Sequence, residues 1–260
     1  MDIYFVITIF LIGFFGSFLS GMVGVGGAII KYPMLLFIPP LLGFAAFTAH
    51  EVSGISAVQV FFATIAGVWA YRGTGYIHRK LVVYMGTSIL IGSFIGAFAS
   101  TLFSGSSVNV VYAILATIAV IVMFLPKKQL PVQSGEQISF NRVLASGLSF
   151  IVGVASGVVG AAGSFLLVPM MLTVFKLPTR VTIATSLAVT FISSIGATVG
   201  KVVTNQVLYG PAIVMIIASV MASPLGAKLG QRMNTKVLQS ILAILILGTS
   251  IQIWFDILKP

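Results

Sequence analysis

Two glycine-rich stretches carry residue types that can bind an anion, in places where a membrane helix should be regular. The first, "SGMVGVGGAIIKYPM", covers residues 20–34, and the second, "SGVVGAAGSFLLVPM", covers residues 156–170. Both lie within apolar runs that would otherwise form regular helices. Glycine and proline interrupt such helices. Backbone N–H groups at the start of the helix after such a break favour a negative charge. The two stretches therefore predict two broken helices that share one anionic ligand.

We expect the ligand to contact the glycines, the polar residues beside them and the prolines that follow. These candidates are Gly24, Gly26, Gly27, Lys31 and Pro33 in the first stretch and Gly160, Gly163, Ser164 and Pro169 in the second. Lys31 would add a full positive charge, and its counterpart is Leu167, so that charge is one-sided. The alternative for Lys31 is that its stem extends to the membrane surface.

Other polar residues in apolar segments are further candidates. His50 and Glu51 begin the segment "HEVSGISAVQ", and a histidine near a carboxylate could carry a proton coupled to anion movement. The alternative is that Glu51 only stabilises a helix N-terminus. Side chains deeper in the segments are predicted to hydrogen-bond the anion, namely Gln59, Thr185, Ser186 and Thr190.

The composition decides the class of protein. Of 260 residues, 58% are hydrophobic and 7% are charged, against roughly 25% charged residues in soluble domains. The chain is therefore a polytopic membrane protein. Its net charge of +10 lies in short loops between apolar runs, which does not indicate nucleic-acid binding. With no cysteine, four acidic residues and two histidines, we expect no catalytic site, no metal and no cofactor, so the partners are a small anion and the bilayer.

The apolar runs give five segments in each half of the chain. They are Ile3–Val23, Ala28–Phe44, Ala45–Tyr71, Leu81–Phe103, Val108–Leu125, Val143–Val159, Ser164–Phe175, Val181–Val203, Leu208–Leu229 and Val237–Leu258. A spanning helix needs about 20 apolar residues, so the run 164–175 is too short to cross. Each glycine-rich stretch is therefore expected at the tip of a hairpin or re-entrant helix.

The two halves look like an inverted repeat. "SG" at 20–21 recurs at 156–157, "AV" at 57–58 recurs at 188–189, and "GSFIGA" at 92–97 corresponds to "ASPLGA" at 222–227. Most of the 14 Lys and Arg lie in the loops 72–80, 127–142, 176–180 and 228–236, which places these loops in the cytoplasm and both termini outside. Corresponding helices then cross in opposite directions, as in many secondary transporters.

The predicted fold is an all-α membrane protein with two inverted-topology repeats. Each repeat has a glycine-broken hairpin followed by three transmembrane helices. The first repeat covers residues 1–126, a cytoplasmic linker covers 127–141, and the second repeat covers 142–260. Pairs of glycines four residues apart are expected to allow close helix packing. These pairs are Gly92/Gly96, Gly153/Gly157, Gly196/Gly200 and Gly226/Gly230. Such faces also permit a homodimer.

The glycine pattern resembles that of the sulfite exporter TauE/SafE family of membrane permeases. The residues that carry this resemblance are Gly21, Gly24, Gly27 and Pro33, repeated as Gly157, Gly160, Gly163 and Pro169. "TSLAV" (185–189) and "GAKLG" (226–230) add to it, whereas "EVSGISAV" (51–58) departs from "TIATSLAV" in the second half. The resemblance covers essentially the whole chain. It implies transport of sulfite, sulfonates or other small organic anions across the cytoplasmic membrane.

The sequence thus predicts a secondary transporter of a small anion, working by alternating access at the interface of the two repeats. Two alternatives stay open: a passive anion channel, and a membrane subunit of a larger complex that does not itself transport. The identity of the anion, the direction of movement and the coupling ion do not follow from the residues.

Overall fold

The computed structural model describes residues 2–24, 28–124, 140–161 and 163–258, and these form helices with no strand. The first five helices are α1 (Ile3–Val23), α2 (Ala28–Leu41), α3 (Ala49–Ala70), α4 (Arg79–Ala99) and α5 (Gly105–Phe124), with a 3-10 turn, η1 (Ser100–Leu102), after α4. The next five are α6 (Arg142–Val159), α7 (Ser164–Thr173), α8 (Thr179–Val203), α9 (Tyr209–Arg232) and α10 (Thr235–Leu258).

Eight of the described helices are long and apolar enough to cross a membrane, which confirms a polytopic membrane protein. The remaining two, α2 with 14 residues and α7 with 10, are the second helix of each half. At about 1.5 Å per residue, both are shorter than the roughly 30 Å apolar thickness of a bilayer. The same order of one long, one short and three long helices therefore occurs twice along the chain.

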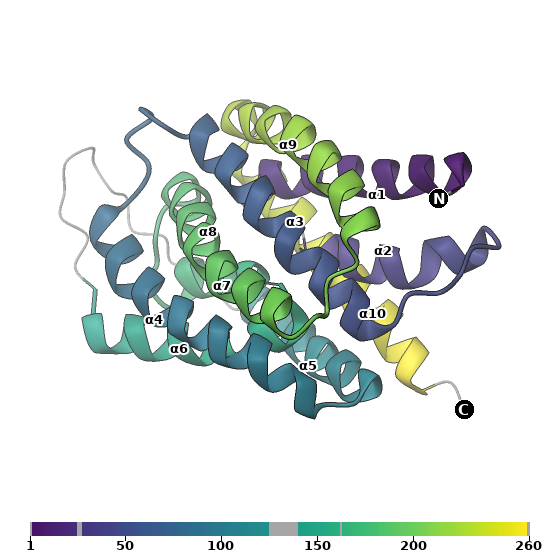
Figure 1. The fold of residues 1–260 in the computed structure, drawn as a ribbon. Helices are drawn as coiled ribbons and strands as arrows, with labels where there is room; N and C mark the ends of the chain where they lie inside the picture. The colour runs from purple at the N-terminus through teal and green to yellow at the C-terminus, as the bar shows by residue number, and fades with distance from the viewer. Residues whose placement is uncertain (1, 25–27, 125–139, 162, 259–260) are drawn as a thin grey trace.

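A glycine in the left-handed conformation ends the first helix of each half. Gly24 ends α1 with φ +78°, and Gly160 ends α6 with φ +74°. Glycine adopts this conformation without the steric penalty of a Cβ atom, so it is the common residue just beyond a helix end. After Gly24 the chain turns back, and α2 packs beside α1 (Figure 1).

The start of α3 is set by a capping box. The run predicted from Ala45 becomes helical only at Ala49, because Thr48 is the N-cap. The Thr48 hydroxyl accepts a hydrogen bond from the Glu51 amide (3.2 Å), and the Glu51 carboxylate accepts one from the Thr48 amide (2.8 Å). These reciprocal bonds satisfy two backbone donors that the first turn would otherwise leave unpaired.

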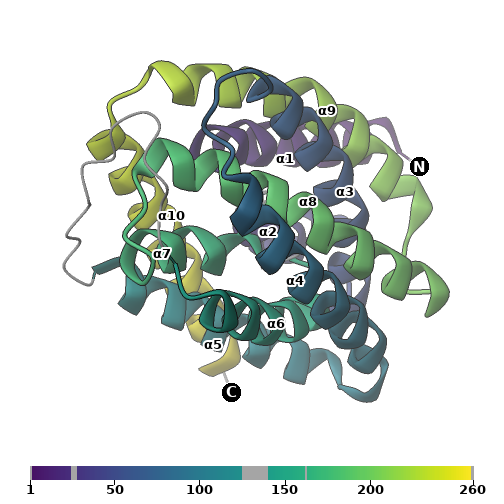
Figure 2. The same cartoon turned by 90° about the vertical axis from the view of Figure 1, so that its left-hand side faces the viewer.

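The central helices are α3 and α8. They lie between a layer that contains α1 and α9 and a layer that contains α4 and α6, as two perpendicular views show (Figures 1 and 2). They are also the most buried of the candidate spans. Ser, Thr, Gln and Lys side chains on these two helices are therefore enclosed by protein rather than exposed to lipid.

Glycines set the close approach of the outer helix pairs. A Cβ atom on Gly226 of α9 would collide with the Phe18 carbonyl of α1, and one on Gly96 of α4 would collide with the Val154 carbonyl of α6. Gly157 meets the Ser93 carbonyl in the same way. The prediction of close packing is confirmed for the pairs listed here: Gly92/Gly96, Gly153/Gly157, Gly196/Gly200 and Gly226/Gly230.

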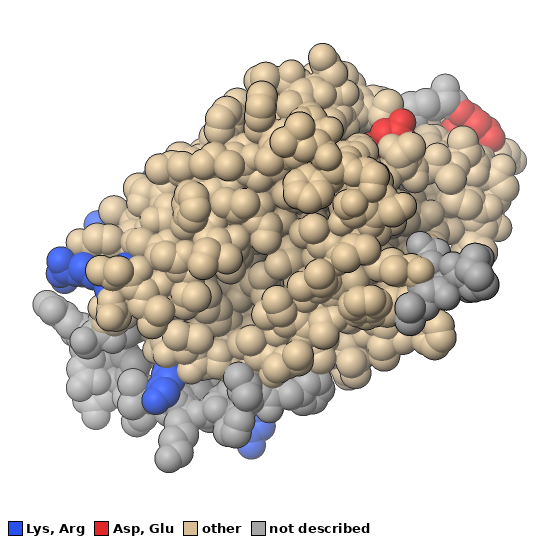
Figure 3. Space-filling model, turned by 90° about the horizontal axis from the view of Figure 1, so that it is seen from below, with Lys and Arg blue, Asp and Glu red and all other residues tan. Residues whose placement is uncertain are grey.

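Charge separates along the molecule. On the face drawn in Figure 3, Lys and Arg side chains gather at one end, and the acidic side chains lie toward the opposite end. Both chain termini lie at one end of the molecule (Figure 1). The candidate spans among the described helices are even in number, which agrees with two termini at one end.

Adding a methyl group at a packed glycine should loosen one helix pair. We expect Gly226→Ala and Gly96→Ala each to lower the free energy of unfolding by about 1–3 kcal/mol, because the new Cβ meets backbone that cannot yield locally. Thermal unfolding of the purified protein in detergent measures this. Gly147→Ala and Gly248→Ala are the controls, since nothing lies within 4 Å of a Cβ at either position. Equal melting temperatures for both pairs of variants would contradict the packing role.

Candidate functional site

Lys31 lies in the protein interior, so the alternative that it reaches the membrane surface is wrong. Its side chain is 0% exposed. The aliphatic stem runs against Gly16 of α1, where a Cβ atom would overlap the Lys31 Cγ atom. Because Gly16 has no side chain, the aliphatic stem of Lys31 can pass beside α1. The ammonium group is then directed toward the central helices.

Four polar residues from four helices meet around this ammonium group, and we name them the Lys31 cluster: Ser17 of α1, Lys31 of α2, Gln59 of α3 and Ser219 of α9. Lys31 Nζ donates to Ser17 Oγ at 3.0 Å, and Ser17 Oγ donates to Ser219 Oγ at 2.7 Å. The Gln59 amide lies 2.6 Å from Ser219 Oγ and 3.3 Å from Ser17 Oγ. All four side chains are 0% exposed, so the cluster is sealed from both ends of the molecule.

The amide of Gln59 leaves one polar atom free inside the cluster. As placed, Nε2 donates to both serines, and the buried Oε1 atom has no partner. If the amide is reversed, each group donates a hydrogen bond to the next one: Lys31 to Ser17, Ser17 to Ser219, and Ser219 to Gln59 Oε1. The amide orientation is assigned from such networks. We prefer the reversed orientation because it gives the Ser219 hydroxyl proton an acceptor, which it otherwise lacks among the described residues; Nε2 is then the polar atom without a partner.

Lys31 also has unused donors. An ammonium group has three N–H bonds, and among the described residues Ser17 is the acceptor found for Lys31. The described carboxylates are elsewhere, since Asp2 and Glu51 cap α1 and α3. Glu136 and the Asp256 side chain lie outside the described part of the chain. A buried cation without a counter-ion is unfavourable unless something pairs with it.

A second buried lysine, Lys201 of α8, has a different environment. Its Nζ atom donates to Ser100 Oγ (2.7 Å), Gln206 Oε1 (2.8 Å) and the Val158 carbonyl (3.0 Å). These three acceptors match the three N–H bonds of an ammonium group. Val158 lies near the C-terminus of α6, where a positive charge is favoured by the helix dipole. Lys201 therefore links α6, α8 and η1 through hydrogen bonds and has no N–H donor left for a ligand.

The glycines at the two turns pack against the central helices. A Cβ atom on Gly24 would lie 2.7 Å from Ile183 Cγ2 of α8, and one on Gly160 would collide with the Ser53 carbonyl of α3. Gly163 is the N-cap of α7 and has φ +70°. The predicted contacts of Gly26 and Gly27, and that of the Ser164 side chain, fall outside the described residues.

The prolines and hydroxyl residues predicted for the site are buried but do not join the Lys31 cluster. Pro33 lies within α2 and Pro169 within α7. Ser186 Oγ donates to the Gly24 carbonyl at 2.9 Å, which fixes the turn after α1 to α8. Thr185 Oγ1 accepts from the His78 amide at 3.0 Å and thereby holds the loop before α4. Thr190 is fully buried, and its hydroxyl has no partner among the described residues.

His50 and Glu51 do not contact one another through their side chains, because Glu51 forms the capping box. The His50 ring lies between two acceptors, the Gln206 Oε1 atom (3.3 Å from Nδ1) and the Phe103 carbonyl (3.0 Å from Nε2). Lys201 fixes which end of the Gln206 amide faces His50, since an ammonium group only donates. A protonated ring can donate to both acceptors, whereas a neutral ring can donate to one.

The corresponding region of the second half is mostly apolar. By the sequence correspondence, Lys31 matches Leu167, Ser219 matches Ile89 and Gln59 matches Thr190. Leu167 and Ile89 are both fully buried and belong to one hydrophobic cluster. The charge of the candidate site is therefore supplied by one half of the chain alone.

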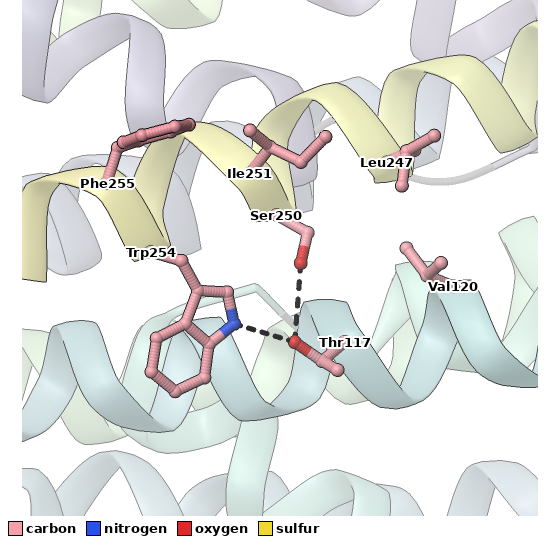
Figure 4. A pocket seen from close by; sticks show the side chains of 7 residues that line it. All are labelled: Thr117, Val120, Leu247, Ser250, Ile251, Trp254 and Phe255. Carbon is pink, nitrogen blue, oxygen red and sulfur yellow. Dashed lines mark hydrogen bonds between the residues drawn. The ribbon is translucent and has the colours of Figure 1, made fainter. Parts of the chain in front are cut away.

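A pocket of about 330 Å³ between α5 and α10 is a weaker candidate (Figure 4). Its polar groups satisfy one another: Trp254 Nε1 donates to Thr117 Oγ1 at 2.9 Å, and Thr117 lies 3.3 Å from Ser250 Oγ. The other lining residues are Val120, Leu247, Ile251 and Phe255. Because no ionisable group lines this pocket, it offers little to an anion.

Sequence reasoning missed Gly16, Ser17, Ser219 and Lys201. A serine in an apolar helix usually bonds its own backbone, so Ser17 and Ser219 looked like ordinary small residues. Only a helical-face comparison of α1 and α9 could have placed both serines toward the centre. Lys201 lies near the end of α8, where a lysine is typical of the membrane surface.

The two buried lysines should differ in their effect on stability. We expect Lys201→Met to lower the free energy of unfolding by about 2 kcal/mol or more, because three buried acceptors lose their donor. Lys31→Met should be neutral or should raise it by about 1 kcal/mol, since it removes a buried charge that lacks a counter-ion. Thermal unfolding in detergent, without added substrate anions, makes the comparison. A larger loss for Lys31→Met would show that Lys31 is the structural lysine.

Comparison with known proteins places the chain in a family and identifies several relatives. The family described as "Sulfite exporter TauE/SafE" matches residues 9–253. A "Probable membrane transporter protein YunE" from Bacillus subtilis is 26% identical over 96% of this chain and 97% of its own length. A "Probable membrane transporter protein" from Xylella fastidiosa is 26% identical over 66% of this chain and 64% of its own. One from Methanocaldococcus jannaschii, MJ0441, is 24% identical over 75% and 72%.

No solved structure matches the chain. The family match covers the ten described helices except the first residues of α1 and the last of α10, so it includes every member of the Lys31 cluster. The buried lysine, the helix hairpins and the eight candidate spans thus occur together in a chain that belongs to the TauE/SafE sulfite exporter family.

Proposed function

We propose that the chain is a secondary transporter of a small anion, and that the Lys31 cluster binds this anion. The observation that carries the proposal is the fully buried Lys31 ammonium group with unused donors and no described carboxylate beside it. Gln59, whose amide contacts Ser17 and Ser219, supplies a neutral Nε2 donor to the same cluster in the reversed orientation. A bound anion would compensate the charge and fill these donors in one step.

The closed state of the cluster favours alternating access over a passive channel. A channel needs a continuous wet path, whereas all four side chains of the Lys31 cluster are sealed. Transport then requires a movement that opens the cluster to one side at a time. The packing of α1 on α9 and of α6 on α4, which are corresponding pairs, supports two inverted halves that could rock about α3 and α8.

The substrate class comes from the family. Its description names sulfite, and we propose sulfite, an organosulfonate or a related sulfur oxyanion for this chain. The concentration of Lys and Arg at one end of the face in Figure 3 supports the placement of that end in the cytoplasm and of both termini outside. The membrane is then the cytoplasmic membrane.

Uptake of labelled sulfite into proteoliposomes tests the function. We expect saturable uptake by the unaltered protein and a loss of about tenfold or more in Lys31→Gln, because removing a buried partner of a charged ligand is costly. Lys228→Gln removes an exposed lysine and serves as the control. Undiminished uptake by correctly folded Lys31→Gln would remove the cluster from the pathway. Flux that never saturates would favour the channel.

His50 is our candidate for proton coupling, with Glu51 beside it. The ring lies between two hydrogen-bond acceptors, the Gln206 Oε1 atom and the Phe103 carbonyl. We expect an inward proton gradient to accelerate uptake by the unaltered protein but not by His50→Gln. His78→Gln is the matched control, because His78 caps α4 outside the membrane-spanning segments. A gradient response that survives in His50→Gln would end the coupling role of His50.

A further inference from the structure

With Lys31 protonated, the Lys31 cluster carries one formal charge. Its other members, Ser17, Gln59 and Ser219, are neutral, and no described carboxylate contacts them. All of them are shielded from water. In such surroundings an uncompensated charge is strongly unfavourable. The bound state is therefore most stable when the ligand brings the net charge of the cluster to zero.

The nearby helix ends do not add a second positive charge. The N-terminus of α2 at Ala28 is positive, but α1 ends shortly before it, at Val23, and the C-terminus of α1 is negative. Each end carries roughly half an elementary charge of opposite sign, so the two contributions oppose one another. The α1 end is further neutralised by hydrogen bonds, such as the one that the Gly24 carbonyl accepts from Ser186.

Lys201 does not add to the cluster either. Its three N–H bonds donate to Ser100, Gln206 and Val158, so it has no donor free to bind a ligand. The second half also places Leu167 where the first half has Lys31. The described structure thus offers one free cation to an anion, not two.

We propose that the Lys31 cluster selects anions by charge and accepts a small monoanion in preference to a dianion of the same shape. This inference rests on the proposed function, because it concerns the same site. For sulfite, the species that binds is then the singly charged hydrogen sulfite. A sulfonate, which holds one charge at any ordinary pH, satisfies the same condition. A dianion would leave one negative charge uncompensated in the interior.

The test uses two competitors that differ in charge but little in shape. Methanesulfonate is a monoanion, and sulfate, which has an oxygen atom in place of the methyl group, is a dianion. Both charges hold at mildly acidic pH, where most sulfite is the singly charged hydrogen sulfite. Each competitor is added at matched ionic strength to the proteoliposome assay of labelled sulfite uptake at that pH. We expect methanesulfonate to compete at a concentration about tenfold or more below that of sulfate. Equal or better competition by sulfate, or competition by neither, would overturn the charge selection.

A substitution within the cluster gives a second, independent test. Gln59→Glu is nearly isosteric and supplies Lys31 with an internal counter-ion, so the fold should be retained while the free charge is lost. We expect an unchanged or higher melting temperature together with a loss of sulfite uptake of about tenfold or more. Asn234→Asp is the control, since it adds a carboxylate at an exposed cap far from the cluster and keeps the bond to the Lys236 amide.

The two proposals fail in different ways. If the unaltered protein takes up no sulfite, the proposed function fails, and the charge selection falls with it. If uptake is saturable and depends on Lys31 but the dianion competes as well as the monoanion, the transporter stands and the charge selection is wrong. Normal uptake by folded Gln59→Glu would also overturn the charge selection, because a neutralised cluster should not attract an anion.

Discussion

A buried ammonium group without a carboxylate is the constraint on which the candidate site depends. Water would stabilise the Lys31 charge, but the side chain is fully enclosed. Protein carboxylates would do so as well, but those described are used in helix caps. What remains is a short chain of hydroxyl and amide groups, which satisfies the ammonium only in part. The groups of the protein itself thus leave the ammonium under-satisfied, and a ligand that brings negative charge would supply what they lack.

Close helix packing is what makes this burial possible. Ser17 and Ser219 can share a hydrogen bond of 2.7 Å because α1 and α9 approach closely along glycine contacts such as Gly226 against Phe18. The Lys31 stem reaches the same point only because residue 16 has no side chain. The glycines outside the two conspicuous stretches therefore position the polar groups, although none of them needs to touch the ligand.

Much of the fold could be predicted from the sequence, because apolar length and basic loops are strong signals in a membrane protein. The ten helices lie close to the predicted runs, and the glycine pairs pack as expected. The site was harder. Lys31 and Gln59 were identified from their polarity, but their partners Ser17 and Ser219 are separated by 202 positions in the chain. Only the three-dimensional arrangement shows which of many small hydroxyl residues face inward.

The two buried lysines show why residue type alone does not identify a binding group. Both are enclosed and both lie on helices of the core, yet Lys201 has an acceptor for every donor, whereas Lys31 has one described acceptor. A fully bonded ammonium holds the protein together, and binding a ligand there would break existing bonds. A partly bonded ammonium gains bonds when a ligand arrives. The number of N–H donors without an acceptor therefore distinguishes a ligand-binding lysine from a structural lysine better than the charge or the depth of burial does.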